Sequence, residues 1–311
     1  MSRFLQEIIT DENLVWDKSL GNKPENFIVR LASKTIDELK RNRKELKNLD
    51  KSNLPELKNE INELKITKIL HGVGLVIIDG KCFTDFSDEE VIEIYRNICK
   101  TLGTLLTQNI KNEKLVKVQY EEKSMQHGGR YHQSKEGGSF HTDSPHWEQV
   151  PDFVGMHCIN PAKKGGESKF VSVYSIHNKM LKEHKQFLEM LYQQFHFDKR
   201  GEFESKESPT VFEPIFTYND NQLKLRYLRD YINDGHKIQN IPLSKEQNEA
   251  LDCFDKIIHD ENLAVSYELK QYDMVFLNNG RVMHGRTSFE DYEDDNLKRI
   301  LVRTWIKDND N

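Results

Sequence analysis

The sequence contains few cysteines, and none are paired at metal-binding or redox spacing. The four cysteines, Cys82, Cys99, Cys158 and Cys253, lie far apart, which excludes a Cys-x-x-Cys zinc knuckle and a thioredoxin motif. Isolated cysteines of this kind are typical of a reducing compartment. We therefore expect a cytoplasmic protein in which they serve as small buried hydrophobic residues.

Long apolar runs and an excess of basic residues are also missing. No run approaches the roughly 20 residues that a membrane-spanning helix needs, and the first residues lack the apolar segment of a signal peptide. Lys and Arg number 45 against 51 Asp and Glu, a formal net charge of −6, which argues mildly against a nucleic-acid backbone as partner. We expect a globular protein with a small-molecule partner, no nucleic acid and no membrane; the oligomeric state is left open.

The N-terminal part of the chain, residues 1–70, is predicted to be a mostly helical cover. Its first 30 residues or so have no clear period. Between residues 33 and 70 the chain is highly charged, and apolar side chains recur at helical spacing. Pro55 suits an early position of the second helix.

Residues 74–306 are predicted to form the core. Residues 74–80 have the pattern of a buried strand, and Ser87 with Glu90 forms a capping box that begins a helix, which Gly103 can end. Further strands are predicted at 153–159, 169–173, 223–231, 267–276 and 299–306, with helices near 176–195 and 244–258.

This organisation predicts one mixed α/β domain over residues 1–311, because no repeat or low-complexity linker divides the chain. Short strands separated by long insertions fit an eight-stranded, double-sheet jelly roll with helices around it. Periodicity alone also leaves a sandwich or another mixed α/β arrangement open.

The sequence holds four His-x-acid pairs, where chance produces about two, and three of them compete as metal ligands. They are His141 with Asp143, His196 with Asp198, and His259 with Glu261. In a strand, His141 and Asp143 would share a face, whereas the third pair ends a helix, where such positions diverge. The second pair lies in a strand-like segment without a related motif, and we interpret it as structural.

A distant histidine completes the preferred set. His284, in the segment His-Gly-Arg-Thr, is predicted to close a strand over residues 273–280, with Asn279 and Gly280 as a tight turn. Two histidines and one carboxylate form the facial triad that leaves open positions on non-haem Fe(II).

At this point the chain resembles a known family. From about residue 74 to residue 305 it is similar to the Fe(II)/2-oxoglutarate-dependent oxygenases of the taurine dioxygenase and clavaminate synthase-like superfamily. The resemblance implies a double-stranded β-helix core, with His141, Asp143 and His284 as metal ligands. The similar blocks are residues 140–143 (Phe-His-Thr-Asp), 165–168 (Gly-Gly-Glu-Ser), 225–229 (Leu-Arg-Tyr-Leu-Arg), 278–279, 284–287 and 299–305.

The resemblance also suggests residues for the organic ligands. Arg299 would pair with the distal carboxylate of 2-oxoglutarate, and Ser168 would hydrogen-bond this co-substrate. Arg303, four residues after Arg299 on the same strand face, would bind an acidic group on the primary substrate. Arg229, flanked by aromatic residues, is a further substrate candidate or else a salt-bridge partner, and Gln108 and Asn109 are candidates for lining the pocket.

These residues predict a dioxygenase that uses Fe(II), 2-oxoglutarate and O₂ to hydroxylate a C–H bond of a small anionic or amino-acid-like molecule, releasing succinate and CO₂. Alternatives are an outcome of desaturation, cyclisation or oxidative cleavage, and a non-catalytic metal-binding jelly roll. A zinc hydrolase that uses His141, His146 and His284 is a further alternative. The resemblance also implies hydroxylation or another oxidation without halide, since halogenating relatives replace the carboxylate found here at Asp143.

Overall fold

The computed structural model of the protein describes residues 3–47, 53–109, 111–120, 137–203 and 206–310. Residues 48–52, part of the predicted N-terminal helical cover, lie outside this description. The expectation of a mixed α/β protein is confirmed. Within the described residues, no helix has the length and apolar character needed to cross a membrane.

A seven-stranded sheet forms the larger part of the core. Its neighbours are antiparallel except for β1 and β2, and β16 pairs with three other strands. In spatial order the strands are β1 (Ile28–Val29), β2 (Leu75–Ile78), β13 (Met274–Asn278), β5 (Phe153–Asn160), β16 (Ile300–Lys307) and β3 (Thr104–Leu105), with β4 (Leu115–Val118) also on β16.

A three-stranded sheet shares an apolar core with the larger one. It consists of β12 (Ala264–Tyr267), β7 (Ser168–Ser172) and β14 (Val282–Arg286). One buried cluster contains Phe170 and Val282 from this sheet together with Leu75, Val154 and Leu301 from the other. The two sheets are therefore held together by side chains that alternate inward along their strands.

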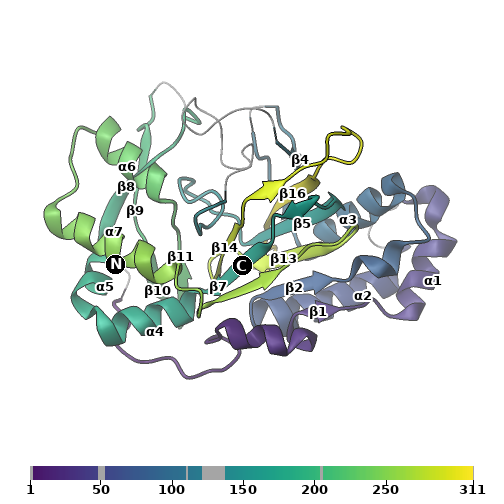
Figure 1. Ribbon diagram of the computed structural model, residues 1–311, viewed down its shortest axis with the longest axis horizontal. Helices are drawn as coiled ribbons and strands as arrows, with labels where there is room; N and C mark the ends of the chain where they lie inside the picture. Colours follow the sequence, from purple (N-terminus) through teal and green to yellow (C-terminus); the bar gives the residue numbers. More distant parts are fainter. Residues whose placement is uncertain (1–2, 48–52, 110, 121–136, 204–205, 311) are drawn as a thin grey trace.

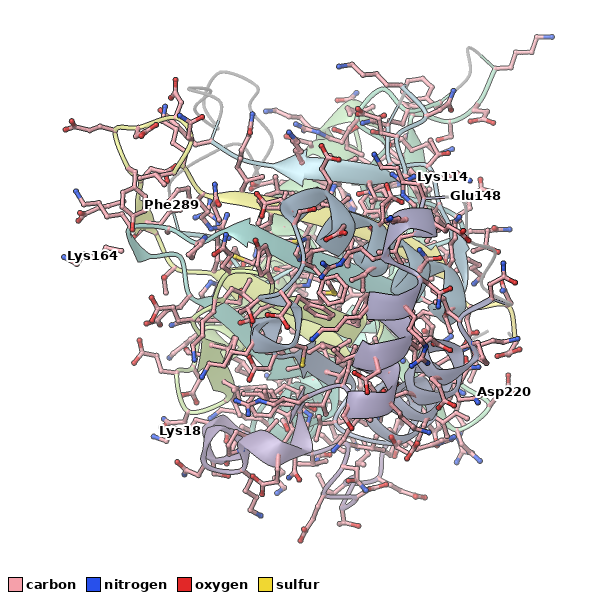
Figure 2. All side chains as sticks on the ribbon, turned by 90° about the vertical axis from the view of Figure 1, so that its right-hand side faces the viewer. Lys18, Lys114, Glu148, Lys164, Asp220 and Phe289 are labelled. Carbon is pink, nitrogen blue, oxygen red and sulfur yellow. The ribbon has the colours of Figure 1, made fainter. Side chains whose placement is uncertain are left out.

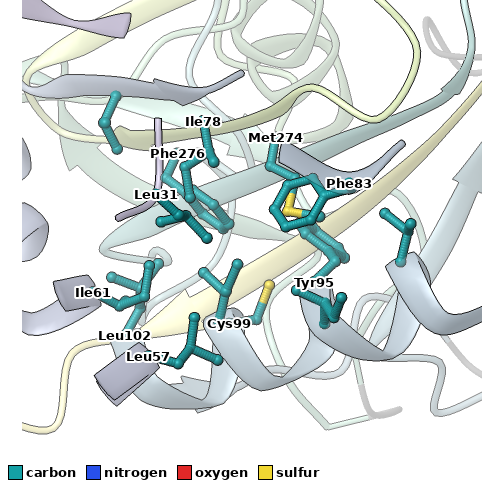
Figure 3. Close-up of a cluster of buried hydrophobic side chains, with 14 of the residues drawn as sticks. Leu31, Leu57, Ile61, Ile78, Phe83, Tyr95, Cys99, Leu102, Met274 and Phe276 are labelled. Carbon is teal, nitrogen blue, oxygen red and sulfur yellow. The ribbon is translucent and has the colours of Figure 1, made fainter. Parts of the chain in front are cut away.

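The N-terminal helices cover the outer face of the large sheet (Figure 1). Tyr95 and Cys99 of α3 pack with Met274 and Phe276 of β13 in the cluster shown in Figure 3. The predicted caps are confirmed, since Ser87 and Glu90 form the capping box of α3. These helices are α1 (Ser33–Arg41), α2 (Pro55–Leu64, followed by a π-helical turn at Lys65–Leu70) and α3 (Asp88–Leu102).

A second helical group lies at the opposite side of the sheets (Figure 1) and has its own apolar cluster. Two short strand pairs accompany it, whereas a third, the last named below, lies beside Arg299. The helices are α4 (Val173–Glu183), α5 (Lys185–Leu191), α6 (Arg229–Ile238) and α7 (Lys245–Ile258). The pairs are β8 (Gln194–Asp198) with β9 (Thr210–Pro214), β10 (Phe216–Asn219) with β11 (Gln222–Leu225), and β6 (Lys164–Gly165) with β15 (Phe289–Glu290).

Two strands are shorter in the structure than the sequence predicted. The predicted strand 223–231 ends at Leu225, and helix α6 begins at Arg229. The buried residues of α6, Ile232, Gly235 and His236, follow the i, i+3, i+4 spacing of a helix. The predicted strand 267–276 is interrupted by a turn. There the Asp273 carboxylate accepts hydrogen bonds from the Lys270 amide and the Tyr267 hydroxyl.

The predicted helix 176–195 is also divided. It is interrupted at His184, which separates α4 from α5, and its last residues belong to strand β8.

Candidate metal centre

The two candidate histidines face each other across the edge of the small sheet. His284 lies in the middle of β14, and the backbone of His141 exchanges two hydrogen bonds of 3.0 Å with it. The imidazole centroids are 4.5 Å apart. Two sequence expectations need correction here: His141 forms an isolated bridge rather than part of a strand, and His284 does not close the strand before it. The turn at Asn279 and Gly280 carries the chain from β13 in one sheet to β14 in the other.

Asp143 completes the predicted cluster. Its Oδ1 lies 3.6 Å from His141 Nε2 and 3.7 Å from His284 Nε2, and one ligand atom from each residue falls within 4.8 Å of the others. The Asn279 side chain holds the Asp143 backbone, because its Oδ1 accepts from the Asp143 amide at 2.8 Å and its Nδ2 donates to the Asp143 carbonyl at 3.0 Å. The carboxylate thus reaches the histidines from a fixed loop.

The protonation states of the cluster suit a cation. The His141 Nδ1 lies 3.0 Å from the Ser139 carbonyl, which fixes the tautomer with a bare Nε2 toward Asp143. Burial alone would raise the pKa of Asp143, but Arg303, His141 and His284 outweigh it and hold that pKa well below its usual range. Burial, with a smaller effect of His141, lowers the pKa of His284 to about 3. Histidine binds a metal in its neutral form and aspartate in its ionised form, so these residue types fit Fe(II).

The second oxygen of Asp143, Oδ2, contacts two side chains of strand β16. Trp305 Nε1 donates to Oδ2 at 2.7 Å, and Arg303 Nη1 lies 3.5 Å from the same oxygen. Arg303 lies over the Trp305 ring, with its guanidinium carbon 4.6 Å from the centroid. Sequence reasoning did not assign Trp305 this contact, although the alternation of β16 puts it on the same face as Arg303.

A cavity extends from the cluster along the same face of β16. Arg299, Leu301, Arg303 and Trp305 all line it, as the alternation of that strand predicted, and so does Ser168 of β7. Ser168 stands opposite Arg286 in the pairing of β7 with β14. Arg286 was also missed, although it lies two residues after His284 on the same strand and therefore on the same face.

Arg299 is a buried cation in the wall of this cavity. It is 5% exposed, and within the described part of the chain no carboxylate lies at ion-pair distance from its guanidinium. Burial and, to a lesser extent, the neighbouring Arg286 lower the pKa of Arg299 to about 10. Phe289 covers the guanidinium at 5.1 Å from the ring centroid, at the edge of the molecule where Lys164 also lies (Figure 2). Such a site is complete only with an anion.

Three other candidates have different surroundings from those expected. Arg229 starts helix α6 and pairs with Asp252 and Asp255 of α7, each at 2.8 Å, and it is not among the residues that line the cavity. The salt-bridge alternative for Arg229 therefore describes its contacts. Gln108 is buried behind Arg303 and does not reach the cavity wall. Asn109 forms a turn, accepting from the Lys111 amide at 3.0 Å.

The competing histidines do not join the cluster. His146 lines the cavity, but its Nε2 lies 3.2 Å from Glu202, so the zinc site that required His146 is not assembled among the described residues. His196 belongs to strand β8, where its ring stacks on Phe212, and His259 follows the last residue of α7. Both agree with the structural interpretation.

Comparisons with curated proteins identify relatives of modest identity. The chain is 28% identical over 246 residues to FR-33289 synthase from Streptomyces rubellomurinus, covering 78% of this chain and 71% of the relative. It is 26% identical over 157 residues to human gamma-butyrobetaine dioxygenase, covering 49% and 40%. This second match spans only about two fifths of the relative.

Solved structures share the fold at low identity. An asparagine oxygenase in complex with Fe(II), 2S,3S-3-hydroxyasparagine and succinate has a TM-score of 0.69 at 15% identity, covering 90% of this chain and 93% of that chain. The non-heme iron oxygenase OrfP in complex with Fe and alpha-ketoglutaric acid has a TM-score of 0.65 at 13% identity, covering 90% and 94%.

The family itself follows from a match over most of the chain. The model of the family described as taurine catabolism dioxygenase TauD, TfdA family matches residues 38–305. The resemblance noted in the sequence is thereby confirmed, as are its cofactor Fe(II) and its co-substrate 2-oxoglutarate. With the His141, Asp143 and His284 cluster in place, the chain belongs to the TauD, TfdA family and is an Fe(II)- and 2-oxoglutarate-dependent dioxygenase.

Proposed function

We propose that the enzyme hydroxylates an aliphatic C–H bond of a small, amino-acid-like substrate that carries an acidic group, with release of succinate and CO₂. The observation that carries this proposal is the charge of the cavity. Arg286, Arg299 and Arg303 line it beside the metal cluster, while Asp143 and Glu202 are the carboxylates among the described lining residues. A cavity with this balance favours anionic ligands.

In this proposal 2-oxoglutarate occupies the end of the cavity at Arg299. The planar guanidinium offers two parallel N–H donors to the distal carboxylate, and the Ser168 hydroxyl adds a hydrogen bond. His141, Asp143 and His284 would hold the iron, which would supply the reaction of O₂ with 2-oxoglutarate. The protein's own contribution is to position both organic molecules and to exclude water behind Phe289 and Leu301.

The primary substrate would lie nearer Arg303. Its Nη2 makes no hydrogen bond to a described residue, whereas Nε and Nη1 face Gln108 and Asp143. Glu202, which accepts from Trp147 Nε1 at 2.9 Å, is the second carboxylate of the lining and would face an ammonium group of the substrate. Relatives of this fold include proteins named as an asparagine oxygenase and as an oxygenase with (3S)-hydroxy-L-Arg bound, which supports an amino-acid-like substrate.

The proposal also takes the two facing sheets as the double-stranded β-helix, or jelly roll, of this family, within one domain that residues 1–70 help to cover. Desaturation or cyclisation is the alternative outcome, because the result depends on which C–H bond faces the metal. Retention of Asp143 as a ligand favours hydroxylation over halogenation.

A substrate screen tests the proposal. The Fe(II)-loaded enzyme is incubated with 2-oxoglutarate, O₂ and a panel of amino acids and their acylated or decarboxylated derivatives, and both succinate and product mass are measured. We expect succinate formation in step with a product one oxygen heavier, only for compounds that keep an acidic group. A product two hydrogens lighter would replace hydroxylation with desaturation. Equal turnover of neutral derivatives would overturn the anionic substrate class.

A further inference from the structure

We propose that Trp305 is a positioning residue for the metal ligand Asp143. By occupying Oδ2 it leaves Oδ1 alone to face the two imidazoles. The inference concerns the metal centre of the dioxygenase and does not depend on the substrate class proposed above.

The hydrogen bonds of the carboxylate divide its two oxygens. Oδ2 receives the indole N–H of Trp305 at 2.7 Å and faces the Arg303 guanidinium at 3.5 Å. Oδ1 faces His141 Nε2 and His284 Nε2 at 3.6 and 3.7 Å, longer than a hydrogen bond. With the Asp143 backbone held by Asn279, the remaining freedom is rotation of the carboxylate, and the indole N–H opposes it.

Trp305 is itself held firmly. The residue is 4% exposed and belongs to the part of β16 that pairs with β5. Its ring contacts Trp147 edge to face, with centroids 5.0 Å apart. A buried donor with one good acceptor has no alternative partner, so losing that acceptor leaves an unpaired N–H. The packed indole therefore presents its N–H to Asp143 Oδ2 from a fixed position.

A second layer fixes the guanidinium that shares Oδ2. Arg303 Nε donates to Gln108 Oε1 at 2.9 Å, and Gln108 Nε2 donates to the backbone carbonyls of Lys114 and Arg303, both at 2.9 Å. The amide of Gln108 thus uses both its donor and acceptor groups. This explains a buried glutamine that does not reach the cavity, since it holds Arg303 against Trp305 and Asp143.

The arrangement has a chemical consequence. A carboxylate can bind a metal through one oxygen or through both, and an iron that must accept a chelating keto acid and O₂ needs open positions. With Oδ2 engaged by Trp305 and Arg303, Asp143 offers one oxygen and takes one position. Residues that orient a ligand in this way contribute about 10–100-fold to metal affinity or activity.

The test compares two tryptophan variants. Trp305→Phe keeps the ring and removes the N–H toward Asp143, whereas Trp147→Phe removes an N–H that donates to Glu202. Fe(II) binding is measured anaerobically by calorimetry without 2-oxoglutarate, and the visible charge-transfer absorption is recorded after 2-oxoglutarate is added. We expect Trp305→Phe to weaken Fe(II) binding about 10-fold or more and to shift the absorption. Trp147→Phe should stay within about 3-fold of the parent protein.

An unchanged Fe(II) affinity and spectrum in a folded Trp305→Phe protein would overturn the inference. So would an equal loss in both variants, because that would indicate general damage to the cavity. If circular dichroism shows that Trp305→Phe does not fold, Trp305→Tyr, which also lacks the indole N–H, takes its place. A weaker Fe(II) affinity at an unchanged melting temperature supports the positioning role, and parent-like affinity rejects it.

Discussion

Strand β16 buries both of its faces, and what covers each face differs. Val302 and Ile306 pack into the apolar cluster of α3 and are 5% and 0% exposed. Trp305 on the other face is 4% exposed, and Arg299, which directly precedes the strand, is 5% exposed. Both nevertheless line the cavity beside the metal cluster. The degree of burial is the same on the two faces, so burial does not distinguish structural from functional residues in this strand.

The difference lies in whether each buried group has its partner within the protein. On the helix-covered face, apolar side chains contact apolar side chains, and burial itself stabilises the fold. On the cavity face, Arg299 has no carboxylate at ion-pair distance among the described residues, and a buried charge without a partner costs stability. We infer that this cost is offset when 2-oxoglutarate supplies the missing charge.

The largest expected effect is the loss of Fe(II) binding and turnover when a residue of the metal cluster is removed. We expect His284→Ala to lose Fe(II) binding and to reduce turnover at least about 1000-fold, because a triad with one ligand missing no longer holds the ion. The melting temperature of the metal-free protein should change little. His196→Ala, which alters a strand histidine outside the metal cluster, should keep Fe(II) binding. Retained iron binding in His284→Ala would show that the ligand assignment is wrong.

Arg299→Met tests whether the two faces respond in opposite directions. Loss of the charge pair should weaken 2-oxoglutarate binding about 100-fold, while the melting temperature of the free protein stays unchanged or rises because an unpaired buried charge is removed. Calorimetric titration and thermal melting measure the two quantities. Lys298→Met removes a neighbouring charge outside the cavity and should alter neither. A lower melting temperature with normal 2-oxoglutarate affinity would show that Arg299 stabilises the fold and does not bind 2-oxoglutarate.

Ile306→Ala should give the converse result on the helix-covered face. Removing a fully buried side chain from a packed cluster lowers the free energy of unfolding by about 2–5 kcal/mol. The affinity for 2-oxoglutarate in the remaining folded protein should stay within about 2-fold, because Ile306 points away from the cavity. Denaturant unfolding and binding at a temperature well below the melting point check both statements. A loss of affinity like that of Arg299→Met would show that the faces are coupled.

The smallest effect concerns the pH dependence of the helix-covered face. His157 of β5 lies between Tyr95 and Tyr272, and burial lowers its pKa to about 4. Below about pH 6.5 His157 therefore takes up a proton in the unfolded chain but not in the folded chain. The free energy of unfolding is highest above that pH and decreases as the pH falls toward 4. His157→Leu should reduce the loss of stability over this interval by up to about 3 kcal/mol. An unchanged pH profile would contradict the assignment.

Local patterns predicted much of the molecule correctly. The capping box of Ser87 and Glu90 marked the start of α3 because both partners lie within one helical turn. The alternation of residues 299–306 placed two arginines on one face of a strand because side-chain direction in a strand has a period of two. The same rule fails for Arg229, where a helix begins at a residue that follows three strand-like positions.

The amino-acid sequence by itself determined the candidates for the metal cluster, the apolar and polar faces of β16 and the helical character of residues 33–41 and 55–64, since each depends on spacing over a few residues. Only the tertiary structure decided that the backbones of His141 and His284 hydrogen-bond to each other. It also decided that Trp305 donates to Asp143, and that Gln108 accepts from Arg303 instead of lining the cavity. These contacts join residues more than 100 positions apart, and their distances depend on how two sheets pack together, which no local periodicity encodes.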